Sequence, residues 1–273
     1  MNIAGLLIWS GGAFGAGVLS ARWNWWRKPL PGIPILMFHK VGEPPKGSKI
    51  KKLWVSDKLF TKQMAYLARE GFRSITFKDI YQHWDNGKPL PDHPILITFD
   101  DGYANNYSEA FPIMESFGFK ATVFVVVQTV GWDNRWHDPA SESRIPMISW
   151  QELKTLQKAG WEIGSHTMSH PRLPRQSAEE RKFELERSRQ VIGEFLEEYP
   201  QTFSYPYGAG EDVKEIRQQV MAAGYRVAVG IHSGKWRLDQ IKNNPLNLPR
   251  IFVRGDENMF DFHLQISRGR SRF

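Results

Sequence analysis

The sequence contains no cysteine among its 273 residues. Disulfide scaffolds, thiolate zinc sites and cysteine nucleophiles are therefore excluded, whereas the redox compartment stays open. A metal ion bound by this chain must take its ligands from histidine, aspartate or glutamate. The chain also lacks low-complexity tracts and internal linkers, and its 41% hydrophobic residues suffice for a sizeable core. These features argue against a disordered or fibrous class.

The formal charge is +7, but the sequence contains no segment in which basic and aromatic residues alternate as in nucleic-acid-binding motifs. Positive residues are spread along the chain, apart from small clusters such as the one at residues 49–52. A net positive charge favours anionic surfaces in general, including phospholipid and acidic cell-wall polymers. We interpret the basic residues as solvated surface and predict no nucleic-acid partner.

Residues 1–21 carry no charged side chain, and the segment is long enough to cross or enter a bilayer. It contains five glycines and lacks the early Lys or Arg of a secretory signal, and the positive charges after it favour a cytoplasmic location for the remainder of the chain. Either a membrane anchor or export signal, or a disordered or packed leader, fits these residues. The first interpretation places the protein in the cell envelope, anchored or secreted.

The rest of the chain alternates predicted strands with predicted helices, so we expect one α/β domain over residues 31–273 after a leader or anchor and junction over residues 1–30. Several strands are continuous apolar runs, as buried parallel strands are. The predicted strands are residues 35–38, 95–99, 121–127, 162–165, 202–205, 225–229 and 248–253. About seven strands in roughly 220 residues could close into a barrel, with the active site at the carboxyl ends of the strands.

Three helix starts are recognisable from their capping residues. Ser56 can cap a helix with an apolar face, and the pairs Ser149 with Glu152 and Ser177 with Glu180 have capping-box spacing. These positions predict where helices begin between the strands.

Two adjacent carboxylates, Asp100 and Asp101, end the apolar strand at residues 95–99, and Gly102 frees the backbone to turn. Neighbouring like charges at the end of a buried strand raise a pKa unless a cation or hydrogen bonds compensate them. A metal ion or a catalytic proton explains the pair, and a loop with a helix-capping Asp explains it as well.

A second polar cluster follows the predicted strand at residues 162–165. His166 and His170 lie four residues apart, a spacing that puts both imidazoles on one side of a helical turn. A histidine pair alone is often only polar surface. Together with the acids at the other strand end, the pair indicates a site with two histidines and one carboxylate, which leaves positions open for water and substrate.

At this point the sequence resembles the polysaccharide deacetylases, the NodB-homology group known as carbohydrate esterase family 4. The segments TFDDG at residues 98–102 and SHTMSH at residues 165–170 are similar to the first two signatures of that family. The resemblance implies a distorted (β/α)₇ barrel of the α/β class. It also implies that Asp101, His166 and His170 bind zinc or another divalent ion, with Co²⁺, Ni²⁺ or Mn²⁺ as alternatives, and that Asp100 is the general base.

The third family signature is only partly present, because Ser204 stands where the family has an arginine that orients the catalytic Asp. Arg250, near a late predicted strand, is our candidate for that role. Pro206 and Tyr207 keep their places, and the resemblance implies that the Tyr207 backbone N–H stabilises the oxyanion. An aromatic and proline turn explains the same residues without a catalytic role.

The usual late signature with the acid histidine is not recognisable, and His263 lies in a poor context for it. His39, however, ends the apolar strand at residues 35–38 and resembles the start of a circularly permuted subgroup, the poly-N-acetylglucosamine type. In that subgroup the acid histidine comes first, so we predict that His39 is the general acid. A lone histidine after a strand is also compatible with a structural role.

The resemblance implies a hydrolase that removes N-acetyl groups from an N-acetylglucosamine-containing polysaccharide and releases acetate. An O-acetyl esterase with the same metal site, or an inactive carbohydrate-binding homologue, remains an alternative. Trp132, Trp136 and His137 follow the predicted strand at residues 121–127, where they could stack on sugar rings or pack the loop. The polymer, the native metal and the oligomeric state are not predicted from the sequence.

Overall fold

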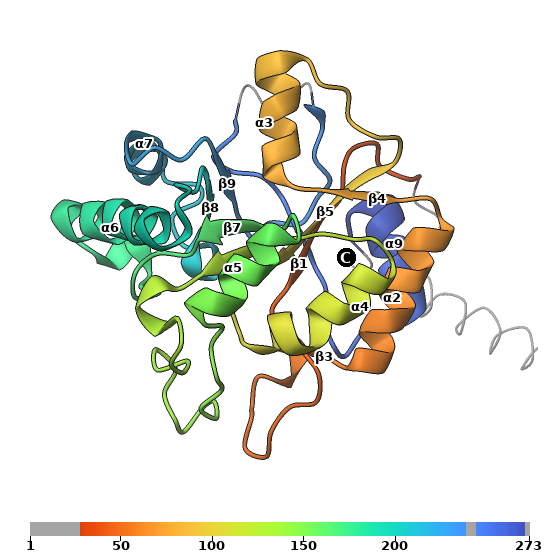
Figure 1. Ribbon diagram of the computed structural model, residues 1–273, viewed down its shortest axis with the longest axis horizontal. Helices are drawn as coiled ribbons and strands as arrows, with labels where there is room; N and C mark the ends of the chain where they lie inside the picture. Colours follow the sequence, from red (N-terminus) through yellow and green to blue (C-terminus); the bar gives the residue numbers. More distant parts are fainter. Residues whose placement is uncertain (1–27, 239–243, 271–273) are drawn as a thin grey trace, which may run out of the picture.

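The computed structural model describes residues 28–238 and 244–270 of the chain. A curled sheet of parallel strands lies at its centre and helices cover the outside of the sheet (Figure 1). The path through the sheet is β10-β1-β5-β6-β7-β8-β9, and β4 pairs with β5 at the start of that strand. The strands are β1 Ile35–Phe38, β4 Arg73–Ile75, β5 Pro94–Phe99, β6 Thr122–Val125, β7 Glu162–Ser165, β8 Thr202–Ser204, β9 Val227–Val229 and β10 Ile251–Phe252.

The sheet closes through the segment that leads into β10. The backbone of Leu248 exchanges hydrogen bonds with β9, donating to Ala228 and accepting from Gly230. The same segment continues into β10, which pairs with β1. The predicted distorted (β/α)₇ barrel is thereby confirmed, with closure made by an irregular segment rather than by a regular strand pair.

Helices and short strands complete the barrel. The helices are α2 Asp57–Arg69, α3 Phe77–Asn86, α4 Phe111–Ser116, α5 Trp150–Lys158, α6 Ala178–Leu196, α7 Lys214–Ala222 and α9 Met259–Arg268. A small parallel pair, β2 Lys40–Val41 and β3 Trp54–Val55, lies beyond the end of β1. The apolar strands are buried on both faces, as their uninterrupted Ile, Val and Phe content predicts.

The predicted helix starts are confirmed. Ser56 accepts a hydrogen bond from Leu59 N at the start of α2. The capping boxes of Ser149 with Glu152 and of Ser177 with Glu180 are both formed, at α5 and α6. The predicted strand at residues 121–127 was too long at both ends, because β6 covers only Thr122–Val125 and a short turn begins at Val127. The strand β4 was missed because it has only three residues and two of them are not buried.

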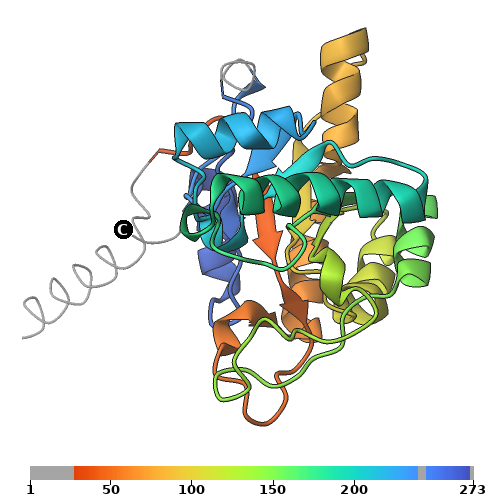
Figure 2. The same cartoon turned by 90° about the vertical axis from the view of Figure 1, so that its left-hand side faces the viewer.

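Two long loops project from the same end of the barrel, where the strands have their carboxyl ends. We name residues 42–53 the basic loop and residues 128–148 the aromatic loop. Figures 1 and 2 both place these segments together at the lower end of the molecule. This end therefore carries the loops that can surround a site.

The predicted membrane segment at residues 1–21 lies outside the described residues, and the proposed boundary between residues 30 and 31 stays a prediction. Among the helices that the structure describes, none combines the length and the apolar character needed to span a bilayer.

Candidate active site

Asp101, His166 and His170 converge at the carboxyl end of the sheet. Asp101 follows β5, and both histidines follow β7. Their side chains are buried, and one ligand atom from each lies within 4.8 Å of the others. The two strand ends that the sequence marked separately thus form one cluster.

The spacing of the three ligand atoms fits a single divalent ion. Asp101 Oδ1 lies 3.4 Å from His166 Nε2 and 3.3 Å from His170 Nε2, and the two Nε2 atoms are 3.2 Å apart. An ion with bonds of about 2.1 Å to each atom separates neighbouring ligands by roughly 3.0–3.4 Å in tetrahedral or octahedral geometry. The donor set of two imidazoles and one carboxylate suits zinc and related ions.

The environment of His166 orients the ring for metal binding. Its Nδ1 donates to the Ser204 carbonyl at 2.7 Å, which leaves Nε2 directed at Asp101. Burial acts to lower the pKa of His166, but the hydrogen bond to Asp101 and the charge of Asp100 outweigh it and raise that pKa. Burial acts to raise the pKa of Asp101, and the hydrogen bonds from the two histidines hold it well below its usual range. Asp101 is therefore ionised and can offer an anionic oxygen to a cation.

Glu184 of α6 holds the turn between the two histidines. Its carboxylate accepts hydrogen bonds from Met168 N at 2.8 Å and from Ser169 N at 3.0 Å. A third bond comes from the Ser169 hydroxyl. Sequence reasoning missed this residue, because nothing near Glu184 in the sequence indicates that its side chain faces the histidine turn.

Backbone strain is concentrated around the cluster. Asp101, Thr167, His170 and Tyr207 have left-handed φ values of 76°, 71°, 63° and 59°. Such conformations cost on the order of 1–3 kcal/mol for each non-glycine residue and persist where surrounding contacts impose them. Gly102 has φ 80°, and a Cβ there would come within 3.0 Å of Val125 Cγ1, so the turn after the two acids requires glycine as the sequence predicted.

Asp100 is held by Arg250, the residue that we predicted for this role. Arg250 Nη1 and Nη2 donate to Asp100 Oδ1 and Oδ2, each at 2.7 Å, and both side chains are buried. The other donors of the guanidinium contact Gly230 O, Thr98 Oγ1 and Ser204 Oγ. Burial acts to raise the pKa of Asp100, but the Arg250 charge holds it below its usual range.

Ser204 connects the base candidate to the histidine cluster. Its hydroxyl accepts from Arg250 Nη2 at 3.0 Å and donates to Asp100 Oδ2 at 3.2 Å. Its carbonyl accepts the His166 Nδ1 hydrogen bond. Ser204, which stands where the family signature has an arginine, thus contacts the guanidinium of Arg250.

His39 follows β1 and faces the same cluster. Burial lowers the pKa of its imidazole, and the charges of Asp101 and Asp100 oppose that shift. Its ring packs edge-on against Phe252 with 5.6 Å between centroids. The Nδ1 atom is buried without a hydrogen-bond partner among the described residues, so this ring nitrogen is available to bond a bound molecule.

Aromatic rings border the histidines. The Tyr207 ring lies 4.5 Å from that of His170, and the Trp136 ring lies 5.0 Å from it on the aromatic loop. Pro206 is buried and opens the short turn Pro206–Gly208 that carries Tyr207. Trp132 is 65% exposed on the same loop. Trp136 therefore contacts the site, whereas Trp132 lies on its outer surface.

A buried ion pair that sequence reasoning missed joins the aromatic loop to β2. Lys40 Nζ lies 3.4 Å from Glu142 Oε1, and both side chains are fully buried. The ammonium also faces the rings of Tyr103 at 4.5 Å and Trp54 at 5.3 Å. Lys40 immediately follows His39 in the chain, so this pair links the loop to the predicted acid.

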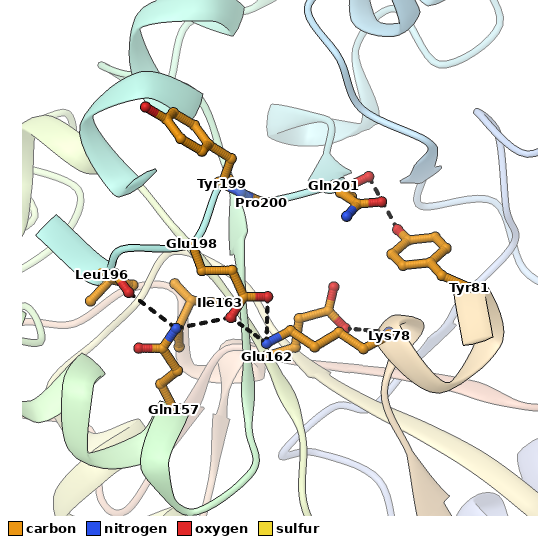
Figure 3. A pocket seen from close by; sticks show the side chains of 10 residues that line it. All are labelled: Lys78, Tyr81, Gln157, Glu162, Ile163, Leu196, Glu198, Tyr199, Pro200 and Gln201. Carbon is orange, nitrogen blue, oxygen red and sulfur yellow. Dashed lines mark hydrogen bonds and ion pairs between the residues drawn. The ribbon is translucent and has the colours of Figure 1, made fainter. Parts of the chain in front are cut away.

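Four other histidines, His83, His93, His232 and His263, have partners outside the cluster. His83 and His93 bond to backbone carbonyls, His232 faces Glu211, and His263 on α9 bonds to the Tyr66 hydroxyl. A separate pocket around Glu162 and Glu198 is shown in Figure 3. Because Glu162 begins β7 and His166 follows its end, this pocket lies at the opposite end of the strand.

Comparisons with known proteins agree with this arrangement. A family model described as polysaccharide deacetylase matches residues 87–228, slightly more than half of the chain. His39 and Arg250 both lie outside that match. The Bacillus subtilis protein YxkH is 27% identical over 221 residues, covering 81% of this chain and 72% of YxkH. A poly-beta-1,6-N-acetyl-D-glucosamine N-deacetylase of Staphylococcus aureus is 27% identical over 217 residues, covering 76% of this chain and 70% of that protein.

Solved structures share the fold. The Streptococcus pyogenes deacetylase PplD in complex with acetate has a TM-score of 0.73 and 22% identity, covering 88% of this chain and 100% of that chain. IcaB from Ammonifex degensii has a TM-score of 0.67 and 20% identity, covering 89% and 99% of the two chains. At these identities the likeness concerns the fold.

Proposed function

Given that the chain belongs to the polysaccharide deacetylase family, we propose that it removes N-acetyl groups from a glycan containing N-acetylglucosamine and releases acetate. The observation that carries the proposal is the convergence of Asp101, His166 and His170 beside the ionised Asp100. The name of the Staphylococcus aureus relative supports N-acetylglucosamine as the sugar. We further propose that the enzyme works at the cell envelope, where such polymers occur.

Metal dependence follows from the family, and we propose zinc as the native ion. Asp101, His166 and His170 would hold it, and the cluster contains no sulfur ligand because the chain has no cysteine. A divalent ion held there would supply Lewis acidity, which would polarise the acetyl carbonyl and lower the pKa of water. Co²⁺, Ni²⁺ and Mn²⁺ accept the same ligands and are the alternatives to zinc.

Asp100 is proposed as the general base. Its carboxylate is kept ionised by Arg250 and lies next in sequence to the ligand Asp101, so it can take the proton of the attacking water. The two guanidinium bonds and the Ser204 hydroxyl fix the orientation of the carboxylate. The water then attacks the acetyl carbon.

Tyr207 and His39 are proposed to complete the reaction. The Tyr207 backbone N–H would stabilise the oxyanion that forms on the acetyl group. His39 would give a proton to the leaving amine, which releases acetate and a free amino sugar. Trp136, packed against His170, would form part of the surface that the sugar meets.

The test is acetate release by the metal-loaded enzyme from N-acetylglucosamine oligomers, with Asp100→Asn as the central variant. Loss of the base should lower kcat by a factor of about 10²–10⁴ while the bound metal is retained. Wild-type turnover by that variant would remove Asp100 from the role of base. If the enzyme releases acetate from acetylated xylan but not from N-acetylglucosamine oligomers, it is an O-acetyl esterase rather than an N-deacetylase.

A further inference from the structure

The basic loop lies at the active-site end of the barrel (Figures 1 and 2). Its lysines concentrate unpaired positive charge there. Lys46, Lys49, Lys51 and Lys52 are all exposed, and none of them forms an ion pair among the residues that the structure describes. The only acid in the loop is Glu43. Four cations within seven residues repel one another, and this arrangement is favourable only where an anion or solvent screens them.

The basic loop has a defined position relative to the site. Glu142 of the aromatic loop accepts hydrogen bonds from Ser48 Oγ at 2.8 Å and from Ile50 N at 3.3 Å. Ser143 Oγ donates to the Lys46 carbonyl at 3.1 Å. The two loops therefore form one unit, and Trp136 of that unit packs against His170.

A further cation, Arg172, lies close to the histidine cluster. Arg172 follows His170 by two residues, and its guanidinium carbon lies 4.3 Å from the centre of the Tyr207 ring. That ring lies in turn 4.5 Å from the His170 ring. Arg172 is exposed and makes no ion pair within the described part of the chain. Its guanidinium is thus held beside a metal ligand with its N–H donors available.

We propose that Arg172 and the lysines of the basic loop form a binding surface for acidic glycans, in which a carboxylate or phosphate group accompanies the N-acetylated sugar. This inference rests on the proposed function for the identity of the sugar. Cations that line a cleft raise the local concentration of an anionic substrate and steer it towards the site. An arginine also offers paired donors that match a carboxylate or a phosphate.

An acidic glycan fits these observations better than an anionic membrane. Arg172 contacts the Tyr207 ring, which in turn contacts His170, so its charge lies next to the site rather than only on a distant surface. Ile50 is the only large apolar residue between Lys46 and Lys52, and it is partly buried, whereas membrane-bound segments combine basic residues with exposed apolar anchors.

Binding can be measured without turnover in the full chain carrying Asp101→Asn. Three probes are tetrasaccharides: neutral N-acetylglucosamine, alternating N-acetylglucosamine and N-acetylmuramic acid, and N-acetylglucosamine that carries a phosphate. The fourth probe is a phosphatidylglycerol vesicle. We expect at least one acidic sugar to bind about ten-fold more tightly than the neutral one at about 50 mM salt, with the difference lost at about 500 mM. The two acidic probes distinguish carboxylate from phosphate.

Two sets of variants locate the effect. Replacing Arg172 and the four loop lysines by glutamine should reduce the affinity for the acidic sugar to that for the neutral one. A matched control replaces four exposed lysines and one exposed arginine elsewhere on the surface, and it should leave the preference unchanged. These residues are Lys62, Lys88, Lys158, Lys214 and Arg73.

Equal affinity for acidic and neutral sugars would overturn the inference, as would an equal loss in the control variant. Vesicle binding that depends on the same lysines, without a preference for acidic sugars, would assign the surface to a membrane instead. A retained preference for acidic sugars together with absent acetate release by the metal-loaded wild type would overturn the proposed function and leave the anion-binding surface in place.

Discussion

Arg250 and Asp100 form a two-point ion pair in the interior, with both N–O distances at 2.7 Å and at most 4% of either side chain exposed. Burial of two charges carries a large desolvation cost, which is offset only when the geometry is good and the remaining donors are satisfied. Here all five N–H donors of the guanidinium have acceptors, from Asp100, Ser204, Thr98 and Gly230.

The first prediction follows from that pair. Arg250→Met leaves the Asp100 carboxylate buried and unpaired, so the free energy of unfolding should fall by about 3–5 kcal/mol. The double variant Arg250→Met with Asp100→Asn carries neither charge and should recover most of that loss in urea unfolding. Acetate release should be absent from both, because the single variant no longer orients the base and the double variant has none.

The control is an ion pair of equal geometry on the surface. Arg226 and Asp85 also make two bonds of 2.7 Å, but 37% and 50% of their side chains are exposed. Arg226→Met should change the free energy of unfolding by only about 0–1 kcal/mol. An equal loss of unfolding free energy in Arg226→Met and Arg250→Met would show that burial does not decide the contribution of the ion pair.

The second prediction concerns metal removal. Chelation should lower the melting temperature, because an ion that binds only the folded chain stabilises it by about 2.7 kcal/mol at a hundred-fold excess over Kd. Adding zinc back should restore both melting temperature and acetate release. In Asp101→Asn, zinc should change the melting temperature much less, and a full shift in that variant would argue against Asp101 as a ligand.

The third prediction tests the buried pair of Lys40 and Glu142. Either Lys40→Met or Glu142→Gln alone leaves one buried charge, so each should lower the free energy of unfolding by about 3–5 kcal/mol. Because the amide oxygen introduced by Glu142→Gln can still accept from Ser48 and Ile50, the double variant should recover stability. KM for the N-acetylglucosamine oligomer should rise in the single variants, because the aromatic loop becomes less rigid. An unchanged KM would show that the ion pair does not contribute to substrate binding.

The fourth prediction is a pH dependence of stability. Burial raises the pKa of Glu162 to about 7 although Thr202 and the Lys78 N–H bond its carboxylate, as Figure 3 shows in part. The pKa of Glu162 in the unfolded chain is 4.5, so its protonated form contributes its full stabilisation below pH 4.5. That contribution is lost progressively as the pH rises from 4.5 through about 7. The loss amounts to on the order of 3 kcal/mol.

Glu162→Gln mimics the protonated carboxyl and should remove that loss. Its free energy of unfolding should match the wild type near pH 4.5 and exceed it increasingly up to about pH 7, with a plateau above. Urea titrations at several pH values measure this difference. A constant difference between the two proteins over the whole range would show that Glu162 does not titrate in this window.

The sequence by itself determined the elements and the chemistry at their ends. The predicted strands at residues 35–38 and 162–165 have the observed bounds of β1 and β7, and the capping boxes predicted the starts of α5 and α6. The acids after β5 and the histidines after β7 were identified because local spacing decides which side chains share a strand end. Short irregular pieces such as β4 gave no comparable periodic signal.

Only the tertiary structure decided which distant residues meet. Arg250, which the sequence offered only as a candidate, reaches Asp100 across 150 positions, and Glu142, which the sequence did not indicate, reaches Lys40 across 102. These contacts depend on the order of strands in the sheet and on the packing of loops, which arise from the burial of the whole core rather than from any local pattern. The left-handed backbone at His170 and Tyr207 has the same origin, because surrounding contacts impose conformations that the isolated residues disfavour.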